Sequence, residues 1–353
     1  MEKKIPLLQR YGIMNRRSFL RLSGLLGLGL ASARVLPAAA ETVRFDRKKY
    51  KVSKTSLAMG TFVSMTLVHS SRDKAEEAMG KAFEEIERLA GLMNRFDETT
   101  AISRLNREGS LKDIPLEVAE VVGRALDYYR FSHGIFDVSV KPVVDLFKER
   151  SSGGKSNLPS EKELEQVLGL VGANNIELRG RSLRFKNPGM GITLDGIAKG
   201  YIVDRASLIL VAHNITDHLV NSGGDIRAMG SAQNGKPWTV AIQDPKGKEC
   251  YPDIIQITDG AIATSGDYEV FFDREKIFHH IVDPRSGLSP ELTASVSVSA
   301  DTAMNADALS TTVFLMNPVQ GAKFIDSNTG CECLIISKKG KRFTSAGWTS
   351  AAV

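Results

Sequence analysis

Two residues with oxygen-bearing side chains, Asp307 and Thr311, stand four positions apart in a stretch with helical periodicity, residues 301–316. At that spacing both side chains lie on one face of a helix. A carboxylate beside a hydroxyl suits a hard cation such as Mg²⁺, which prefers oxygen ligands and completes its shell with waters and substrate phosphates. The pair is equally typical of a helix-terminal aspartate with a threonine packed nearby, so the pattern alone leaves both interpretations open.

A second stretch, LDGIAKGY at residues 194–201, combines small residues with one cation. We expect a strand-to-helix junction here, because small residues let backbone groups approach a ligand closely. Lys199 adds a positive charge near the start of the predicted helix, where peptide N–H groups also favour anions. The stretch therefore predicts a phosphate site, although a tight turn carrying a surface lysine would have the same pattern.

Two further stretches group glycines or polar residues closely. Gly223 and Gly224 follow a predicted strand and permit a turn with positive φ or close packing against a ligand. His279 and His280 precede Asp-Pro-Arg at residues 283–285, but no other His or Cys lies at zinc-ligand spacing, so the pair alone is more typical of structural or surface positions. Together with the anion and oxygen sites, these stretches predict a metal-assisted site for a pyrophosphate compound.

These groups must be positioned by a fold that mixes helices with short strands. Apolar residues recur every three or four positions in the predicted helices and cluster or alternate in the predicted strands. Helices are predicted at residues 73–95, 116–131, 161–170, 200–212 and 301–316, and strands at 57–68 (broken at Gly60), 176–185 (a hairpin), 218–220, 239–243, 254–257, 295–299, 333–337 and 342–344. Because strands and helices do not alternate regularly, the sequence favours the α+β class, with mixed or antiparallel sheets and packed helices, over a doubly wound sheet.

The first forty residues differ from the rest of the chain in charge and composition. They hold seven basic residues and one acidic residue, whereas the whole chain carries a formal net charge of +5 at pH 7. Paired arginines at residues 16–17 precede Ser-Phe-Leu, an apolar run at residues 22–33 and an alanine triplet, as in a twin-arginine secretory signal. We expect residues 1–40 to be this signal peptide, residues 41–353 the catalytic domain, and the protein to be periplasmic. Retention of the segment as an uncleaved anchor is the alternative, although the apolar run is short for a bilayer.

Composition excludes two other classes of protein. Without the first forty residues the chain is close to neutral, and with two Trp, seven Tyr and no basic cluster it does not resemble a nucleic-acid-binding protein. The cysteines, Cys250, Cys331 and Cys333, are too few and odd in number for a disulfide framework. Cys331 and Cys333 share one face of a predicted strand, and we expect them to be small buried apolar residues.

Taken in order, these stretches resemble the ApbE family, the FAD:protein FMN transferases. The resemblance runs from residues 59–61 through Asp97, residues 102–106, residues 136–142 and all the stretches described above to residues 343–345. It covers nearly all of the chain after the signal, and so many motifs in one order are specific where no single motif would be. The resemblance implies a single α+β catalytic domain.

The resemblance implies Mg²⁺-dependent transfer of FMN from FAD to a Thr or Ser hydroxyl of a partner protein. The hydroxyl attacks the FMN phosphorus of FAD, AMP leaves, and FMN stays joined to the partner through a phosphoester. FAD is then the substrate and Mg²⁺ the cofactor. The implied acceptor is a membrane-associated redox subunit that carries a short Ser/Thr-containing motif. The twin-arginine signal is similar to that of family members linked to nitrous-oxide reduction, which suggests an electron-donating membrane flavoprotein of that pathway.

The resemblance also assigns site residues by position. For the metal it implies the backbone carbonyl of Gly196 and the side chains of Asp307 and Thr311. For FAD it implies Met59, Phe96, Phe136, Asp137, Val138, Lys199 and Ile281. His280 stands at the position of the family histidine, and an imidazole pKa of ~6.5 makes it a candidate general base, although it could equally orient its loop. His280 and Asp307 are thus the predicted catalytic residues.

Two positions depart from the family pattern. Thr193 stands where many members have the first Asp of Asp-Leu-Gly-Gly, and an acidic residue, Asp195, occurs two places later. This puts a flavin hydrogen bond at the first position in question. Phe96 replaces a tyrosine, which keeps the aromatic face and loses the hydroxyl.

Two other functions fit parts of the same pattern. A metal-dependent FAD pyrophosphatase, which releases FMN and AMP with water as the acceptor, needs the same metal and pocket. A non-catalytic FAD-binding or flavin-delivery protein would keep the aromatic residue, the lysine and the glycines but needs no metal site. The presence of both Asp307 and Thr311 argues against the second alternative.

Overall fold

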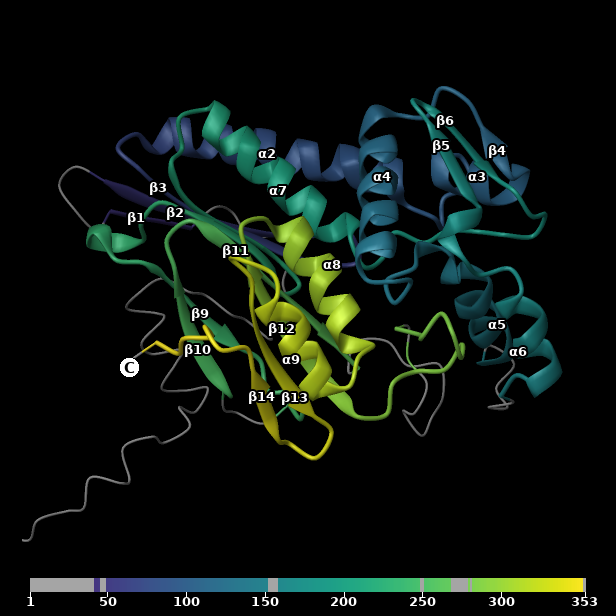
Figure 1. Cartoon of the computed structure of the whole chain (residues 1–353). Coiled ribbons are helices and arrows are strands. Elements are labelled where there is room, and N and C mark those ends of the chain that lie inside the picture. The colour runs from purple at the N-terminus through teal and green to yellow at the C-terminus, as the bar shows by residue number, and fades with distance from the viewer. Residues whose placement is uncertain are drawn as a thin grey trace, which may run out of the picture.

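A nine-stranded antiparallel sheet lies at the centre of the molecule (Figure 1). The computed structural model describes residues 41–44, 49–151, 158–247, 251–267, 279 and 281–351. The strands follow the order β1 (Glu41–Arg44), β2 (Tyr50–Ala58), β3 (Thr61–His69), β7 (Asp217–Ser222), β8 (Asp225–Met229), β11 (Gly260–Gly266), β12 (Thr293–Ala300), β13 (Glu332–Ser337) and β14 (Arg342–Thr344). Every neighbouring pair in this order is antiparallel, so hairpins and longer returns build the sheet without βαβ crossovers.

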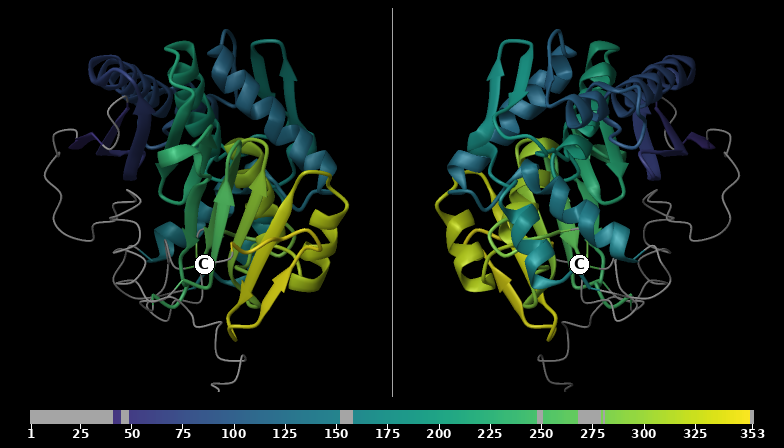
Figure 2. Two further views of the ribbon diagram at one scale, coloured as in Figure 1. Left: turned by 90° about the vertical axis from the view of Figure 1, so that its left-hand side faces the viewer. Right: turned by 90° about the vertical axis from the view of Figure 1, so that its right-hand side faces the viewer.

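Three helices cover one face of this sheet: α2 (Arg72–Met93), α7 (Ala198–Ala212) and α8 (Ala303–Phe314) (Figures 1 and 2). The side chain of Ser71 caps α2 by accepting a hydrogen bond from the N–H of Lys74. The buried residues of α2 recur every three or four positions, as the sequence predicts: Ala75, Ala78, Met79, Ala82, Phe83, Ile86, Leu89 and Met93. This face packs on the inward residues of the sheet and forms the main core.

The opposite face of the sheet packs against a separate hairpin, β9 (Trp238–Ile242) and β10 (Asp253–Ile257). Alternation along the strands separates the two cores, because successive strand residues point to opposite faces. Val220 joins the helix-side core, whereas its neighbour Leu219 packs with Trp238 of the hairpin. Helix α9 (Pro318–Asp326) lies beside β13.

A smaller group of elements extends beside the main sheet (Figure 1). It contains α3 (Ala101–Glu108), α4 (Leu116–Phe131), the 3-10 turn η2 (Val138–Val140), α5 (Lys141–Ser151), α6 (Glu161–Leu168) and a three-stranded sheet of β4 (Ser110–Leu111), β6 (Ser182–Phe185) and β5 (Ile176–Arg179). The chain passes from this group towards α7 through residues 190–194, which belong to no helix or strand. The two groups therefore meet at the start of α7.

The predicted α+β class is confirmed, with helices mixed with antiparallel sheets. One local prediction is wrong. The segment before Gly196 is not a strand, because residues 190–194 belong to no strand of the described sheets. The helix predicted at residues 301–316 is confirmed as α8, and a helix that was not predicted, α9, follows it. Asn317 caps α9 by accepting a hydrogen bond from the N–H of Val319, and Pro318 suits the first turn.

Cys333 is buried, as predicted, and burial raises the pKa of its thiol to about 11, which favours the neutral form. Cys331 is only partly buried, and both cysteines are free. The predicted signal peptide, Cys250 and His280 lie outside the described residues. Among the helices that the structure describes, none combines the length and apolar character needed to cross a membrane.

Candidate active site

One cavity collects residues from distant parts of the chain, where the two groups of elements meet. Its lining comes from the loop before η2, the start of α7, the first residue of β8, the end of β11, the loop after residue 280, and α8. It includes eight of the predicted site residues: Phe136, Asp137, Val138, Gly196, Lys199, Ile281, Asp307 and Thr311. The fold therefore brings together, in one place, residues up to 175 positions apart in the sequence.

The predicted metal ligands converge in a tightly packed part of this cavity lined by Gly196, Ser265, Asp307 and Thr311. We call these four residues, together with Gly200, which bonds to Asp307 behind the lining, the inner corner. Asp307 and Thr311 lie on successive turns of α8, and Asp307 is 5% exposed. A Cβ at Gly196 would lie 3.0 Å from the Thr311 hydroxyl oxygen, a tight contact, so the absence of a side chain at Gly196 leaves room for that hydroxyl.

These residues offer one carboxylate, one hydroxyl and one backbone carbonyl, all of them oxygen donors of the kind that Mg²⁺ takes. Within the described residues, no three His, Cys, Asp or Glu side chains gather closely enough to hold a metal ion. The oxygen set of the inner corner fits a magnesium ion that draws further ligands from waters and from a phosphate compound.

Close contact between α7 and α8 fixes the inner corner. The Oδ2 atom of Asp307 accepts a hydrogen bond from the N–H of Gly200 at 3.0 Å. A Cβ at Gly200 would lie 2.3 Å from the carbonyl oxygen of Ala303, so only glycine allows this approach. One turn further along α7, the carboxylate of Asp204 accepts the N–H groups of Ala303 and Met304 at 2.8 and 2.9 Å. Burial raises the pKa of Asp204, and these hydrogen bonds oppose that effect.

Lys199, the predicted phosphate-binding cation, lines the same cavity and forms an ion pair with Asp225. The Nζ atom lies 3.4 Å from Asp225 Oδ2, and the side chains are 24% and 2% exposed respectively. The buried carboxylate thus holds the ammonium at the cavity wall. Asp225 belongs to the stretch with the glycine pair, but its pairing with Lys199 was not predicted.

The Phe136–Val138 stretch forms another wall, and Asp137 stabilises its backbone. Asp137 Oδ1 accepts hydrogen bonds from the N–H and the hydroxyl of Ser139 at 2.7 and 2.6 Å, and Oδ2 accepts the N–H of Ala173 at 3.1 Å. Burial raises the pKa of Asp137, whereas these three hydrogen bonds lower it. The carboxylate therefore braces the loop that carries Phe136 and Val138.

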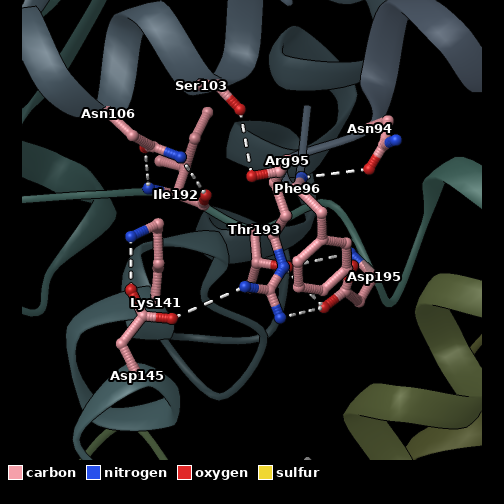
Figure 3. A network of polar contacts seen from close by, with 10 residues as sticks. All are labelled: Asn94, Arg95, Phe96, Ser103, Asn106, Lys141, Asp145, Ile192, Thr193 and Asp195. Atoms are coloured by element: carbon pink, nitrogen blue, oxygen red, sulfur yellow. Dashed lines mark hydrogen bonds and ion pairs between the residues drawn. The ribbon is translucent and has the colours of Figure 1, made fainter. Parts of the chain in front are cut away.

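Phe96 lies outside the cavity lining and is 65% exposed. The Arg95 guanidinium lies 4.4 Å from the centre of its ring, and the Lys148 ammonium lies 4.7 Å from it. Arg95 also pairs with Asp195 at 3.1 Å and Asp145 at 3.5 Å, as Figure 3 shows. We call Arg95, Phe96 and Asp195 the rim, because Asp195 lines the cavity and links the exposed aromatic ring to it.

At the Thr193–Asp195 departure from the family pattern, the acidic residue Asp195 pairs with Arg95 in the rim. Asn106 holds the segment of residues 190–194 through two hydrogen bonds to the backbone of Ile192. Its side-chain amide nitrogen donates to the Ile192 carbonyl, and its side-chain oxygen accepts from the Ile192 N–H (Figure 3). Thr193 also lines the cavity, and its hydroxyl accepts the N–H of Asp195 at 3.3 Å. The carboxylate of Asp195 is then directed to Arg95, so the moved acidic residue forms an ion pair within the protein.

Met59 occupies the turn between β2 and β3, with a left-handed φ of 52°, and is partly buried against the main core rather than in the cavity lining. This turn lies next to the glycine pair, because the N–H of Gly223 bonds to the carbonyl of Phe62 at 3.2 Å. The neighbouring histidine, His279, is buried, and its ring meets Phe314 edge-on with centres 5.5 Å apart. His279 is therefore structural, in line with the prediction for the isolated pair.

Two residues that contact predicted site residues were given no role from the sequence, although one of them, Ser265, lies in a stretch at residues 263–268 that belongs to the resemblance. Ser265 lines the cavity, and its hydroxyl lies 2.8 Å from that of Ser310 and 3.3 Å from that of Thr311. Arg95 precedes a residue singled out for FAD, and its side chain is only 10% exposed despite its charge. A serine in a strand has no distinctive pattern, whereas an arginine beside a predicted ligand-stacking ring could have been noticed.

Comparisons with known proteins point to one family. The family model described as the ApbE family matches residues 59–335. A protein from Haemophilus influenzae named FAD:protein FMN transferase is 29% identical over 87% of this chain and 93% of its own length. One of the same name from Escherichia coli K12 is 27% identical over 83% of this chain and 85% of its own length.

Solved structures show the same likeness. The ApbE protein of Thermotoga maritima has a TM-score of 0.76 and 29% identity, and the match covers 84% of this chain and 97% of that one. The flavin transferase ApbE of Vibrio cholerae has a TM-score of 0.72 and 26% identity, with 87% and 98% covered. The fold and the sequence therefore agree on the same relatives.

Proposed function

This chain belongs to the ApbE family, and on that premise we propose that it transfers FMN from FAD to a Thr or Ser hydroxyl of a partner protein, with Mg²⁺ bound at the inner corner. FMN transfer from FAD to a protein is the activity of the FAD:protein FMN transferases that match most of this chain. The chain is accordingly a transferase with FAD as its substrate and a protein as its acceptor. The metal, the leaving group and the acceptor hydroxyl are the proposed parts.

The observation that carries the proposal is the convergence of an oxygen-ligand set and a lysine in one cavity. Asp307 and Thr311 come from α8, Gly196 and Lys199 come from the start of α7, and all four line the same space. An oxygen-ligand set suits a hard cation, and a fixed ammonium suits a phosphate oxygen. This pairing of groups is what a pyrophosphate substrate requires.

The charges of the cavity support a divalent cation. The described lining residues include four carboxylates, those of Asp137, Asp195, Asp225 and Asp307, and one amine, that of Lys199. Two of these carboxylates pair with basic side chains, Asp225 with Lys199 and Asp195 with Arg95. The lining still holds more acidic than basic groups, and a bound cation would offset that balance beside an anionic pyrophosphate. Bound Mg²⁺ would withdraw negative charge from the pyrophosphate oxygens during transfer.

The transfer is a single phosphoryl-group substitution in this proposal. The acceptor hydroxyl oxygen bonds to the FMN phosphorus, and the bond from that phosphorus to the bridging oxygen breaks. AMP leaves with the electron pair of the broken bond. Lys199 holds a phosphate oxygen, and the Phe136–Val138 wall and Ile281 position the substrate. The hydroxyl proton passes to a base, for which His280 is the candidate from the sequence.

We also propose where the reaction takes place and with what partner. The twin-arginine pattern at residues 16–17 supports export of the chain and activity in the periplasm. The acceptor proposed from the family resemblance is a membrane-associated redox subunit with a Ser/Thr-containing motif. Mass spectrometry of proteins captured by the exported chain would identify the acceptor by an FMN-modified Thr or Ser.

The test uses the purified chain with FAD, Mg²⁺ and a candidate acceptor domain. The expected result is flavin fluorescence that stays with the acceptor on a denaturing gel, with one AMP formed per FMN transferred. An acceptor with its Thr replaced by Val is the matched control and should stay unlabelled.

Two other outcomes would contradict the proposal. Formation of free FMN and AMP at the same rate with and without the acceptor, together with no labelled acceptor band, would identify a FAD pyrophosphatase. Tight FAD binding with no product of either kind, for any acceptor, would identify a flavin-binding protein.

A further inference from the structure

Ser265 has hydroxyl contacts that reach the inner corner from the sheet side. It lies near the end of β11, where its backbone is opposite Val296 of β12. Its hydroxyl oxygen is 2.8 Å from Ser310 Oγ and 3.3 Å from Thr311 Oγ1. Ser310 is completely buried, so its hydroxyl has no access to bulk water. The three hydroxyls therefore form a chain whose far end is the predicted metal ligand Thr311.

The direction of each proton in this chain follows from counting donors. A serine or threonine hydroxyl has one proton to donate and two lone pairs. Ser310 Oγ donates its proton to the backbone carbonyl of Asp307 at 2.9 Å, because a carbonyl can only accept. Ser310 Oγ must then accept the hydroxyl proton of Ser265. Ser265 has no second hydroxyl proton to donate. Towards Thr311, Ser265 can only accept.

This order of donors leaves the Thr311 proton on the Ser265 side. The lone pairs of Thr311 Oγ1 are then free to point elsewhere, including towards a cation beside Asp307. A hydroxyl whose proton points at a cation cannot act as its ligand, so the rotation of this group decides whether the site is complete. The next residue shows the alternative, because Thr312 donates its proton to the carbonyl of Ala308 at 2.7 Å, the usual helical arrangement.

We propose that Ser265 is a positioning residue for the cation site, acting through Thr311. This inference rests on the proposed function, since it requires a metal at Asp307 and Thr311. Partners of this kind, which contact a metal ligand rather than the metal, typically change metal affinity or activity by about 10–100-fold when they are removed.

Loss of the Ser265 hydroxyl would have two consequences. The Thr311 proton would lose its acceptor and could rotate towards the cation. The buried Ser310 oxygen would lose the proton it accepts, but Ser310 would still donate to Asp307. The backbone of Thr311 would stay in place because it lies inside α8.

The experiment measures Mn²⁺ binding by electron paramagnetic resonance, on the full chain with saturating FAD and no acceptor. Mn²⁺ is the probe because it takes oxygen ligands as Mg²⁺ does. We expect Ser265→Ala to raise the Mn²⁺ Kd about 10-fold, and Ser265→Thr, which keeps the hydroxyl, to restore it to within about 3-fold of the parent. The Kd for FAD without metal and the melting temperature should change little.

Two variants make the result specific to the hydroxyl chain. Ser310→Ala alters a residue outside the cavity lining and removes the oxygen that accepts the Ser265 proton, so the hydroxyl chain predicts a rise in the Mn²⁺ Kd there too. Ser297→Ala is the matched control: it removes a hydroxyl that is as buried as that of Ser310 and that bonds to Thr264 at 2.7 Å. It should leave Mn²⁺ binding unchanged.

Asp307→Ala distinguishes a failure of the role proposed for Ser265 from a failure of the proposed metal site. Loss of specific Mn²⁺ binding in this variant, with unchanged binding in both Ser265→Ala and Ser310→Ala, would overturn the role of Ser265 and keep the metal site. Unchanged Mn²⁺ binding in Asp307→Ala would instead overturn the proposed metal site itself.

Discussion

The inner corner and the rim are built in different ways, although both belong to the same candidate site. In the inner corner, backbone atoms approach so closely that a side chain is excluded at Gly200, a side chain at Gly196 would crowd Thr311, and Asp307 is almost completely buried. In the rim, Arg95 joins an exposed ring to carboxylates on two other segments. In the proposed reaction, the group that needs ångström-level placement is thus supported by helix packing, and the proposed contact with the flat ring of the flavin is assigned to exposed side chains.

The strongest test of this contrast is Asp307→Ala. We expect turnover to fall by at least about 100-fold, because a bound metal contributes several kcal/mol to charge stabilisation and each ~1.4 kcal/mol is a factor of ten in rate. FAD affinity should change much less, because the rim and the loop walls remain. Transfer rate and FAD binding are measured separately. The matched control is Asp301→Ala, which removes an exposed carboxylate just before α8. Equal losses of FAD binding and turnover in Asp307→Ala would contradict the separate roles of the inner corner and the rim.

Gly200→Ala tests whether the inner corner depends on close packing. The added methyl group would lie 2.3 Å from the Ala303 carbonyl oxygen, so α7 and α8 must separate. We expect a loss of about 1–3 kcal/mol or more in the free energy of unfolding, together with a large loss of turnover. Gly91→Ala in α2 is the control, because no atom lies within 4 Å of its new methyl group. That variant should be as stable as the parent or up to ~1 kcal/mol more stable. Equal denaturation midpoints for the two variants would refute the packing argument.

Acidification should lower the free energy of unfolding through a buried histidine between β7 and α7. His218 of β7 is buried against Ser207 of α7, with 2.7 Å between the ring Nε2 and the hydroxyl oxygen. Burial lowers its pKa to about 4, so the folded state keeps the ring neutral while the unfolded state takes up a proton below its ordinary pKa of ~6.5. The free energy of unfolding is therefore highest above that value. It should fall by up to about 3 kcal/mol between pH 6.5 and 4.

Denaturant titrations at several pH values measure this dependence. His218→Gln removes the titrating group and should flatten the curve over that interval, whatever its effect at neutral pH. His213→Gln replaces a different histidine, the exposed residue that follows α7, and is the control for exchanging a histidine as such. A parent protein whose stability is constant down to pH 4 would contradict the role assigned to His218.

The smallest expected effect is at the rim. Phe96→Ala should weaken FAD binding by about 3- to 10-fold, the range that a stacking contact of ~0.5–1.5 kcal/mol gives. Because the ring is 65% exposed, stability should change by no more than about 0.5 kcal/mol. Phe96→Tyr keeps the aromatic face and should bind FAD as well as the parent. Turnover at saturating FAD should be nearly unchanged in both variants, and a large fall in it would place Phe96 in the chemistry.

Local patterns in the sequence predict most of the fold that carries the site. The spacing of apolar residues in α2 and α4 and the turn residues of the β5–β6 hairpin were sufficient, because these elements are decided by nearby residues. Helices α3, α5 and α9 were not predicted. In each case a short element depends on capping and on packing against distant partners.

The candidate site is predictable only as a set of residues. The spacing of Asp307 and Thr311 indicates a shared helix face, but nothing local indicates that Gly196 touches Thr311 or that Asp195 pairs with Arg95. These contacts link residues about a hundred positions apart, and their geometry follows from how α7, α8 and β11 pack. No role was predicted for Ser265 for the same reason, because only its neighbours in space distinguish it from other serines.

Metal dependence of protein flavinylation tests the central claim most directly. The full chain is treated with EDTA, incubated with FAD and an acceptor domain, and then supplied with Mg²⁺, while covalent flavin in the acceptor is followed on a denaturing gel. We predict no labelled acceptor before Mg²⁺ is added and rapid labelling afterwards in the parent, with none at either stage in Asp307→Ala. Labelling that continues in EDTA, or that survives the loss of Asp307, would contradict the metal-assisted transfer proposed for this cavity.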